Sequence, residues 1–544
     1  MTNRLTLHAG LCAAMLCATT VQAQPDHDGH AFGKVHFQIS CSPAAQEQFD
    51  VAVAMLHSFF YPETDKAFRA IADQEPSCAM AQWGVAISQR PNPLTAPFAP
   101  ANLKNGAEAI QRARTATQAT PRERDWIEAL APFFQAADST AQRDRTQLYA
   151  DAMARLHETY PEDSEASVFY ALALLEAVDL ADRTYGSQLK AAAILEGVQR
   201  AQPEHPGVVH YIIHAYDYAP LATKGLAAAR QYASLASSAP HAVHMPSHIF
   251  STLGMWREAI DANLAADAAN VSYATSVNPA AASNPAGIFA RYHALDFLVN
   301  AYLQLGQDAS AKAILDQRNA VPLVPVGERI TIHTAYAAIP VRYAFEREAW
   351  QDAANLTVPT TPYREAEAIT WFGRAIGAAR SGDLVGAKKD LAEISRLRRA
   401  LATDGDPYWA EQVGIQEDAA NAWIALGEKK IGDAVTSMES AADREDRSEK
   451  HVAMENRLSP MRELYGELLL EAGKPQEALE QFEHALERSP NRVRSLDGAA
   501  RAAEGAGEPS NVIFYYRKLV DLTSNADPVR PLIRGARARV NGGR

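Results

Sequence analysis

The stretch LYGELLLEAGKPQEALEQFEHALERSP, residues 464–490, indicates the fold of the whole chain. The small residues Gly466 and Ala478 let two helices approach closely, and Phe482 is large enough to fill the space between neighbouring helix pairs. Pro490 ends the second helix because its nitrogen has no hydrogen to donate to the backbone. The pattern predicts a helical hairpin that packs against further hairpins.

Together with Ala485, these residues occupy positions 8, 20, 24, 27 and 32 of a unit, and this pattern resembles the 34-residue tetratricopeptide repeat (TPR). Looser copies occur elsewhere, for example at residues 63–86, where Phe68 and Pro76 are spaced like Phe482 and Pro490. The resemblance covers most of residues 44–525. It implies an all-α, right-handed superhelical solenoid of TPR-like hairpins, whose first helices line a concave groove, as in exported bacterial TPR-like proteins.

Composition agrees with this interpretation, because the chain is rich in Ala, Leu, Glu and Arg and has few alternating β-branched runs. A net charge of −13 argues against nucleic acid as a partner. The expected division is a signal peptide (1–23), an N-terminal extension (24–43), an N-terminal array with the histidine-rich groove (44–330) and a C-terminal array (331–544).

The N-terminus predicts export to the periplasm or beyond. Arg4, an apolar run and the small-residue pattern at 21–23 are typical of a secretory signal peptide cleaved before Gln24. No later segment has 18 consecutive apolar residues, so no transmembrane segment is expected. In an exported chain, Cys41 and Cys78 are expected to form a disulfide, with isolated thiols as the alternative.

Histidines recur with the spacing of the repeat. Pro206 and Pro240 are 34 residues apart, and the same distance separates His210 from His244 and His214 from His248. Residues four apart share one face of a helix, so each pair can chelate an ion. By alignment to the repeat, this face points roughly into the groove, where imidazoles from adjacent hairpins can meet a single ion.

The same spacing from prolines selects further candidates. They are His293, eight residues after Pro285; Glu165, four after Pro161; and Asp217 and Asp296, each eleven after a proline. The predicted metal ligands are His210, His214, Asp217, His244, His248 and His293. Glu165, Asp296, His57 and His241 are possible partners of the ligand imidazoles, although His241 is a weaker candidate because it is out of register.

Neutral imidazoles favour a transition metal, so Zn, Cu, Fe or Ni is the expected cofactor. The alternatives are a ladder of hydrogen-bonded histidines without metal, and a metal-free surface for a protein or peptide ligand in the groove. HYIIH at 210–214 has the histidine spacing of zinc proteases, but Tyr211 replaces the second-position Glu that such enzymes use as base. No catalytic residue is identified.

Three functions remain open from the sequence. The first is an exported binding or scaffold protein whose groove carries a metal site. The second is a metal-dependent enzyme, a hydrolase or an oxidoreductase, that uses the same site. The third is a metal-free scaffold for protein–protein interactions.

Overall fold

The computed structural model describes residues 31–95, 97–135, 141–323, 329–455, 457–528 and 530–542. Within these ranges the regular structure is helical, apart from one isolated backbone bridge between Cys78 and Gln118. The predicted signal peptide lies outside the described residues. In the described part, no helix combines the length and the apolar character needed to span a membrane.

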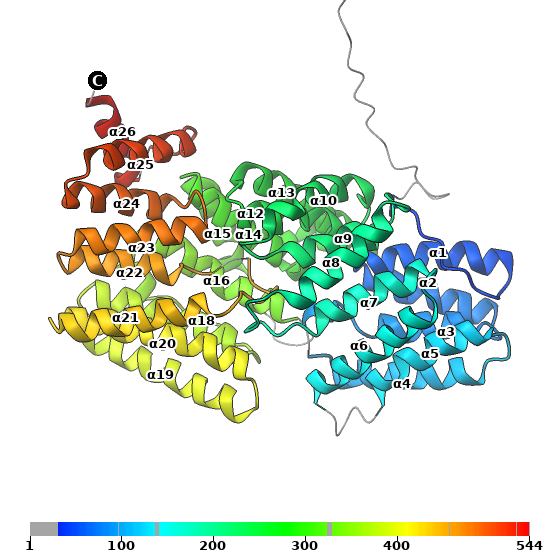
Figure 1. Ribbon diagram of the computed structural model, residues 1–544. Coiled ribbons are helices and arrows are strands. Elements are labelled where there is room, and N and C mark those ends of the chain that lie inside the picture. Colours follow the sequence, from blue (N-terminus) through cyan, green and yellow to red (C-terminus); the bar gives the residue numbers. More distant parts are fainter. Residues whose placement is uncertain are drawn as a thin grey trace, which may run out of the picture.

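The helices follow one another as stacked antiparallel pairs (Figure 1). The first are α1 (Pro43–His57), α2 (Tyr61–Gln74), α3 (Ala79–Ser88), α4 (Pro100–Thr115), α5 (Pro121–Phe134), α6 (Gln142–Thr159), α7 (Ser164–Glu176), α8 (Gly186–Gln199) and α9 (Pro206–Tyr216). The middle ones are α10 (Ala222–Leu235), α11 (Pro240–His244), α12 (Pro246–Thr252), α13 (Trp256–Val277), α14 (Tyr292–Gln304), α15 (Asp308–Ala320) and α16 (Ile330–Glu346).

The C-terminal helices continue the stack. They are α17 (Trp350–Ala354), α18 (Arg364–Arg380), α19 (Leu384–Thr403), α20 (Pro407–Gly427), α21 (Ile431–Asp446), α22 (Met461–Glu471), α23 (Pro475–Arg488), α24 (Val493–Ala506), α25 (Pro509–Leu522) and α26 (Pro531–Gly542). Short 3₁₀ turns η1 (Pro93–Thr95), η2 (Pro279–Ser283), η3 (Pro285–Gly287) and η4 (Phe289–Arg291) interrupt the connections.

Packing around Phe482 shows why the hairpins stack. The ring of Phe482 on α23 lies between Gly466 on α22 and Gly498 on α24. A Cβ atom added at either glycine would fall within 2.8 Å of the ring, so only glycine fits at both positions without a shift of the neighbours. Phe68 packs against Gly84 in the same way near the N-terminus. The predicted all-α solenoid of TPR-like hairpins is confirmed.

The predicted disulfide is also confirmed. Cys41 and Cys78 are bonded, with their Cα atoms 5.5 Å apart. Cys41 lies two residues before α1, and Cys78 is the residue that precedes α3. The bond therefore joins the starts of two helices that belong to neighbouring hairpins.

The buried apolar residues form two clusters that divide within α16. The two parts are nevertheless joined, because the turn before α24 packs onto the middle of the chain. Trp256 Nε1 donates to the carbonyl of Asn491 (2.8 Å), and the backbone N–H of Val493 donates to Gln304 Oε1 (2.9 Å). The last hairpins thus return to α13 and α14, the helices that carry Trp256 and Gln304.

A second connection is made by residues 447–455, between α21 and α22, which we call the closing segment. The backbone N–H of Glu449 donates to the carbonyl of Leu180 (3.1 Å), and Lys450 Nζ donates to Asp217 Oδ2 (2.7 Å). Further along, Asn300 Nδ2 donates to Glu455 Oε1 (3.1 Å). The closing segment therefore bridges the loop after α7, the end of α9 and the middle of α14.

Candidate metal centre

Two breaks in the helices position the histidines. Pro206 begins α9, and the four-residue spacing places His210 and His214 on one face of that helix. Pro240 begins α11 in the same way, but Pro246 starts a new helix, so His244 lies at the end of α11 and His248 lies on α12. The five-residue α11 and the seven-residue α12 still keep both side chains on the side that faces α9 and α14.

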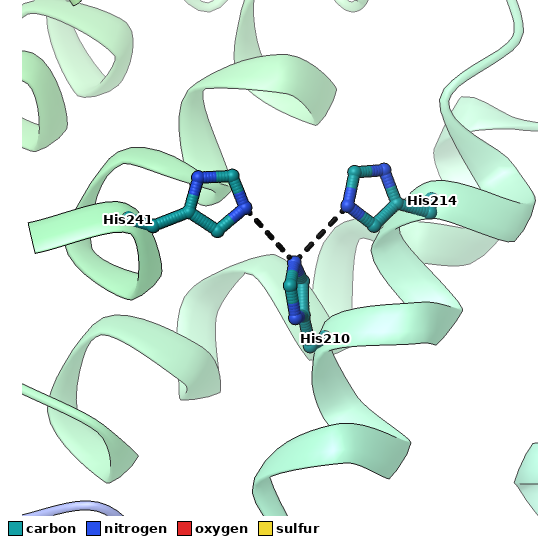
Figure 2. Close-up of side chains that lie close together, drawn as sticks. All are labelled: His210, His214 and His241. Atoms are coloured by element: carbon teal, nitrogen blue, oxygen red, sulfur yellow. Dashed lines mark hydrogen bonds between the residues drawn. The ribbon is translucent and has the colours of Figure 1, made fainter. Parts of the chain in front are cut away.

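The first group of imidazoles, which we call trio A, consists of His210, His214 and His241. The Nε2 atom of His210 lies 3.0 Å from Nε2 of His214 and 3.2 Å from Nε2 of His241 (Figure 2). His210 and His214 come from α9, whereas His241 is the second residue of α11. His241, the weaker sequence candidate, therefore completes this group.

The second group, trio B, consists of His244, His248 and His293. The Nε2 atoms of His244 and His248 are 3.1 Å apart, and the ring of His293 is centred 4.7 Å from that of His244. His293 is the second residue of α14, and its Nδ1 is buried without a hydrogen-bond partner. In each trio, one helical repeat supplies two histidines and the next repeat supplies the third.

Hydrogen bonds on the far side of the trio B rings determine where their protons lie. His244 Nδ1 is 2.7 Å from Oδ1 of Asn263, whose amide nitrogen donates to the carbonyl of Ala259. His248 Nδ1 is 2.9 Å from the carboxylate of Asp217. Both Nδ1 atoms must donate because both partners are acceptors, so in neutral rings both Nε2 atoms present lone pairs. These two lone pairs face each other at 3.1 Å.

The spacing of these nitrogens matches that of two imidazoles bound to one metal ion. Two nitrogens bound tetrahedrally at about 2.0–2.1 Å from zinc lie about 3.3 Å apart, close to the separations of 3.0 Å in trio A and 3.1 Å in trio B. In trio A the Nδ1 of His210 lies 2.6 Å from the carbonyl oxygen of His57, so His210 also directs a bare Nε2 at its neighbours. The donor set therefore fits a transition metal in each trio.

A proton is a poor substitute for the metal, because burial disfavours charged imidazole. Desolvation lowers the pKa of His210 and of His244 to about 3 each. It also lowers the pKa of His214, His241 and His293 well below the usual value, and neighbouring histidines lower it further. At neutral pH the imidazoles of both trios are uncharged, which is the form that binds metal.

Each trio is closed on one side by an aromatic ring. Phe59 contacts the three rings of trio A, and Phe297 contacts the three rings of trio B. Phe59 adopts a left-handed backbone conformation (φ 53°), which bulky residues rarely adopt and which structures retain mainly near functional sites. The two trios are neighbours, since the ring centres of His214 and His248 are 6.1 Å apart.

A third group with a similar spacing, His57, Glu165 and His205, has different chemistry. The Val208 N–H donates to His205 Nδ1, so His205 Nε2 carries the proton and donates to Glu165. His57 contacts Glu165 through Nε2 (2.9 Å) and the Tyr211 hydroxyl through Nδ1 (2.9 Å). Although burial opposes its charge, His205 and His57 hold the pKa of Glu165 well below its usual range. No lone pairs converge here, and we call this group the carboxylate network.

The remaining sequence candidates lie behind the imidazoles or away from them. Asp217, expected as a ligand, contacts His248 Nδ1 and Lys450 instead, so it orients a ring. Asp296 lies 2.8 Å from Nε of Arg342 and forms a buried ion pair with that residue. The structure also differs from the expected single ion, because the candidate imidazoles separate into two trios.

Comparison with known proteins adds little to this picture. No family model and no curated protein matches the chain. Among solved structures, the TPR domain of P58(IPK) is 12% identical, with 92% of this chain and 99% of that chain covered and a TM-score of 0.21. The human IFIT1 dimer with m7Gppp-AAAA is 12% identical, with 82% and 90% covered and a TM-score of 0.34. The human IFIT1 dimer with PPP-AAAA is 11% identical, with 85% and 94% covered and a TM-score of 0.37. The TPR-like fold described above rests on the packing of the hairpins themselves.

Proposed function

We propose that this protein binds two transition-metal ions side by side, one in each histidine trio, within a TPR-like superhelix. The observation that carries the proposal is the contact between Nε2 of His244 and Nε2 of His248, 3.1 Å apart with both protons committed to the opposite ring nitrogens. Lone pairs brought this close in a buried site repel each other unless a cation lies between them.

The ligand set narrows the metal to ions that favour imidazole, namely Zn, Cu, Ni and Fe. Three protein ligands leave a coordination position open, which is typical of catalytic rather than purely structural zinc sites. A bound ion with an open position can activate water or bind a further ligand. The proposal therefore includes metal-dependent enzymes, hydrolase or oxidoreductase, as a class consistent with the same centre.

Export of the mature chain is part of the proposal. The disulfide between Cys41 and Cys78 supports it, because such bonds persist in oxidising compartments and are rare in the cytosol. A metal-free peptide groove, the alternative from the sequence, has less support at this place. The chain's own closing segment already packs beside the histidines, with Lys450 on Asp217.

Metal analysis of single variants tests the proposal. The mature protein, purified without a metal-binding tag, is loaded with Zn, Cu, Ni or Fe in separate samples and its bound metal is counted. We expect about two ions per chain in the parent, about one in His210→Ala and in His244→Ala, and about none when the two changes are combined.

The matched control is His484→Ala, which removes an exposed histidine on α23 and is expected to keep both ions. Circular dichroism of each variant confirms that its helices remain folded. A parent that binds none of the four metals, or a combined variant that binds as much as the parent, would falsify the proposal.

A further inference from the structure

A cavity of about 120 Å³ reaches trio A from the side of the closing segment. Its polar lining consists of Glu176, His214, Asp217, Tyr218, Lys450 and His451, and the carboxylate of Glu176 is already paired with Arg90. Its apolar lining consists of Leu94, Leu175, Val178, Leu180 and Val452. A cavity of this size holds about four water molecules, or a small molecule of a few heavy atoms. A candidate ligand of the metal therefore lines a chamber that joins polar and apolar surfaces.

The charges around the trios leave metal ions without a counter-charge. Imidazole ligands carry no negative charge, so two divalent ions would bring four positive charges to the two trios. Asp217, the carboxylate nearest to trio B, already receives hydrogen bonds from His248 and Lys450. Buried charge that is not compensated is strongly unfavourable, so a loaded centre attracts an anion.

The cavity has the groups that an organic anion needs. An ammonium group has three N–H donors, and Lys450 uses one of them on Asp217. Its side chain is 11% exposed, and a charge-assisted hydrogen bond is strong at so sheltered a position. The leucine and valine side chains that line the cavity favour a ligand with a short hydrocarbon group over a purely inorganic ion.

We propose that this chamber binds a small organic monocarboxylate. Its carboxylate would contact the metal beside His214 and the ammonium of Lys450, and its short alkyl group would lie against Leu175 and Val178. The inference rests on the proposed function, because the carboxylate binds to a metal-loaded trio A. It goes further by assigning the open coordination position to a defined class of ligand.

The test uses the full mature chain loaded with Co²⁺, whose visible absorption changes when a ligand joins the metal. Acetate, propionate and chloride are titrated separately. Propionate is expected to bind about fourfold more tightly than acetate, because it buries one more methylene group. Chloride, which has no alkyl group, is expected to bind more weakly than either carboxylate.

Two variants locate the binding site. Lys450→Met is expected to weaken propionate binding by about tenfold or more, since it removes a charged hydrogen-bond donor. Val178→Trp, in the loop after α7, fills the apolar side and is expected to abolish the preference for propionate over acetate while both ions remain bound. Lys474→Met, at an exposed position on the last residue before α23, is the matched control and is expected to bind propionate like the parent.

The outcomes separate this inference from the proposed function. A parent that binds two Co²⁺ ions but shows equal affinity for chloride and propionate, or no spectral change with either, overturns the carboxylate chamber alone. Parent-like propionate binding by both Lys450→Met and Val178→Trp overturns it as well. A parent that binds no Co²⁺ and none of the four metals overturns the metal centre itself.

Discussion

Three helices that occupy equivalent places in the stack carry different residues at their second position. This difference separates the carboxylate network from the two histidine trios. The second residue is Glu165 in α7, His241 in α11 and His293 in α14. Each side chain points at a histidine of the preceding part of the stack. Glu165 accepts a hydrogen bond from His57, whereas His241 and His293 bring a further imidazole to a histidine pair. The position is shared, and the chemistry depends on the residue type.

The comparison teaches that proximity alone does not define a metal site. The carboxylate network and the trios have similar spacings, but in the network every ring nitrogen of His57 and His205 has a hydrogen-bond partner. In the trios, His210, His244 and His248 each hold a proton on the outer nitrogen, and their inner nitrogens face a neighbouring imidazole. The direction of hydrogen bonding therefore distinguishes a group whose ring nitrogens all have partners from one whose lone pairs are available to a cation.

Metal removal is expected to have the largest effect on stability. This effect should disappear when the histidines of the two trios are replaced. With free metal at 100 times Kd, each site adds about 2.7 kcal/mol to the free energy of unfolding, or about 5.5 kcal/mol for both. Thermal unfolding of the loaded and the chelated protein measures the difference. The combined His210→Ala/His244→Ala variant should not respond to chelator, and equal melting temperatures for loaded and chelated parent would contradict the assignment.

Disrupting the carboxylate network should lower the stability of the protein without changing its metal content. Glu165→Ala leaves His57 and His205 buried without their shared acceptor, and the expected cost is about 3–5 kcal/mol. Glu158→Ala, at an exposed position on α6, is the control and is expected to change stability by less than about 0.5 kcal/mol. A folded Glu165→Ala protein that has lost an ion would show that the network belongs to the metal centre.

A smaller change is expected behind trio B. Asn263→Ala removes the acceptor that orients His244, and losing such a partner typically weakens metal binding by about 10–100-fold. Competition with a chelator measures the affinity of each site. Asn270→Ala is the matched control on α13, since Asn270 donates to a backbone carbonyl of the same helix as Asn263 does. Equal metal affinities in the two variants would mean that the Nδ1 contact does not orient the ligand.

The smallest expected effect, for each histidine, is the change of the stability of the metal-free protein with pH. Burial lowers the pKa of His210 and of His244 to about 3, while an unfolded histidine titrates near 6.5. The unfolded state therefore binds more protons between these values, and stability falls as the pH decreases below about 6.5. The slope is up to about 1.4 kcal/mol per pH unit for each such histidine.

Urea denaturation midpoints at pH 7, 6 and 5 measure this slope. Replacing His210 and His244 with glutamine removes two of the groups that titrate, so the decline should become shallower. A parent whose midpoint does not change over this range would show that the trio imidazoles are not held neutral.

The local part of the fold could be predicted from sequence because it is periodic. The contact of Phe482 with Gly466 follows from positions of the repeat pattern, and Phe68 and Gly84 make a similar contact near the N-terminus. The contacts that return the end of the chain to its middle carry no such signal. Nothing in the sequence around Asn491 or Lys450 indicates that they meet Trp256 and Asp217, more than 200 residues earlier.

The histidine pairs were predictable because His210 and His244 occupy the same, fifth position of α9 and α11. His241 was undervalued because its partner His210 lies 31 residues earlier, which is not one repeat length. Glu165 was aligned with His210 by counting from Pro161, but α7 begins only at Ser164. Counting from Pro161 therefore gave Glu165 the wrong helix position, because this proline is not the first residue of α7.

The return of the chain end has a consequence for how the molecule unfolds. An open repeat array can lose terminal units one at a time, because each unit contacts only its neighbours. Here Asn491 is hydrogen-bonded to Trp256, and Lys450 is hydrogen-bonded to Asp217. The C-terminal part of the chain and the centre of the stack therefore contact each other directly. Truncation directly after α23, which removes Asn491, would remove a support of α13, the helix whose Asn263 orients His244. A shortened chain is therefore expected to lose cooperativity across the whole molecule rather than to leave an intact N-terminal part.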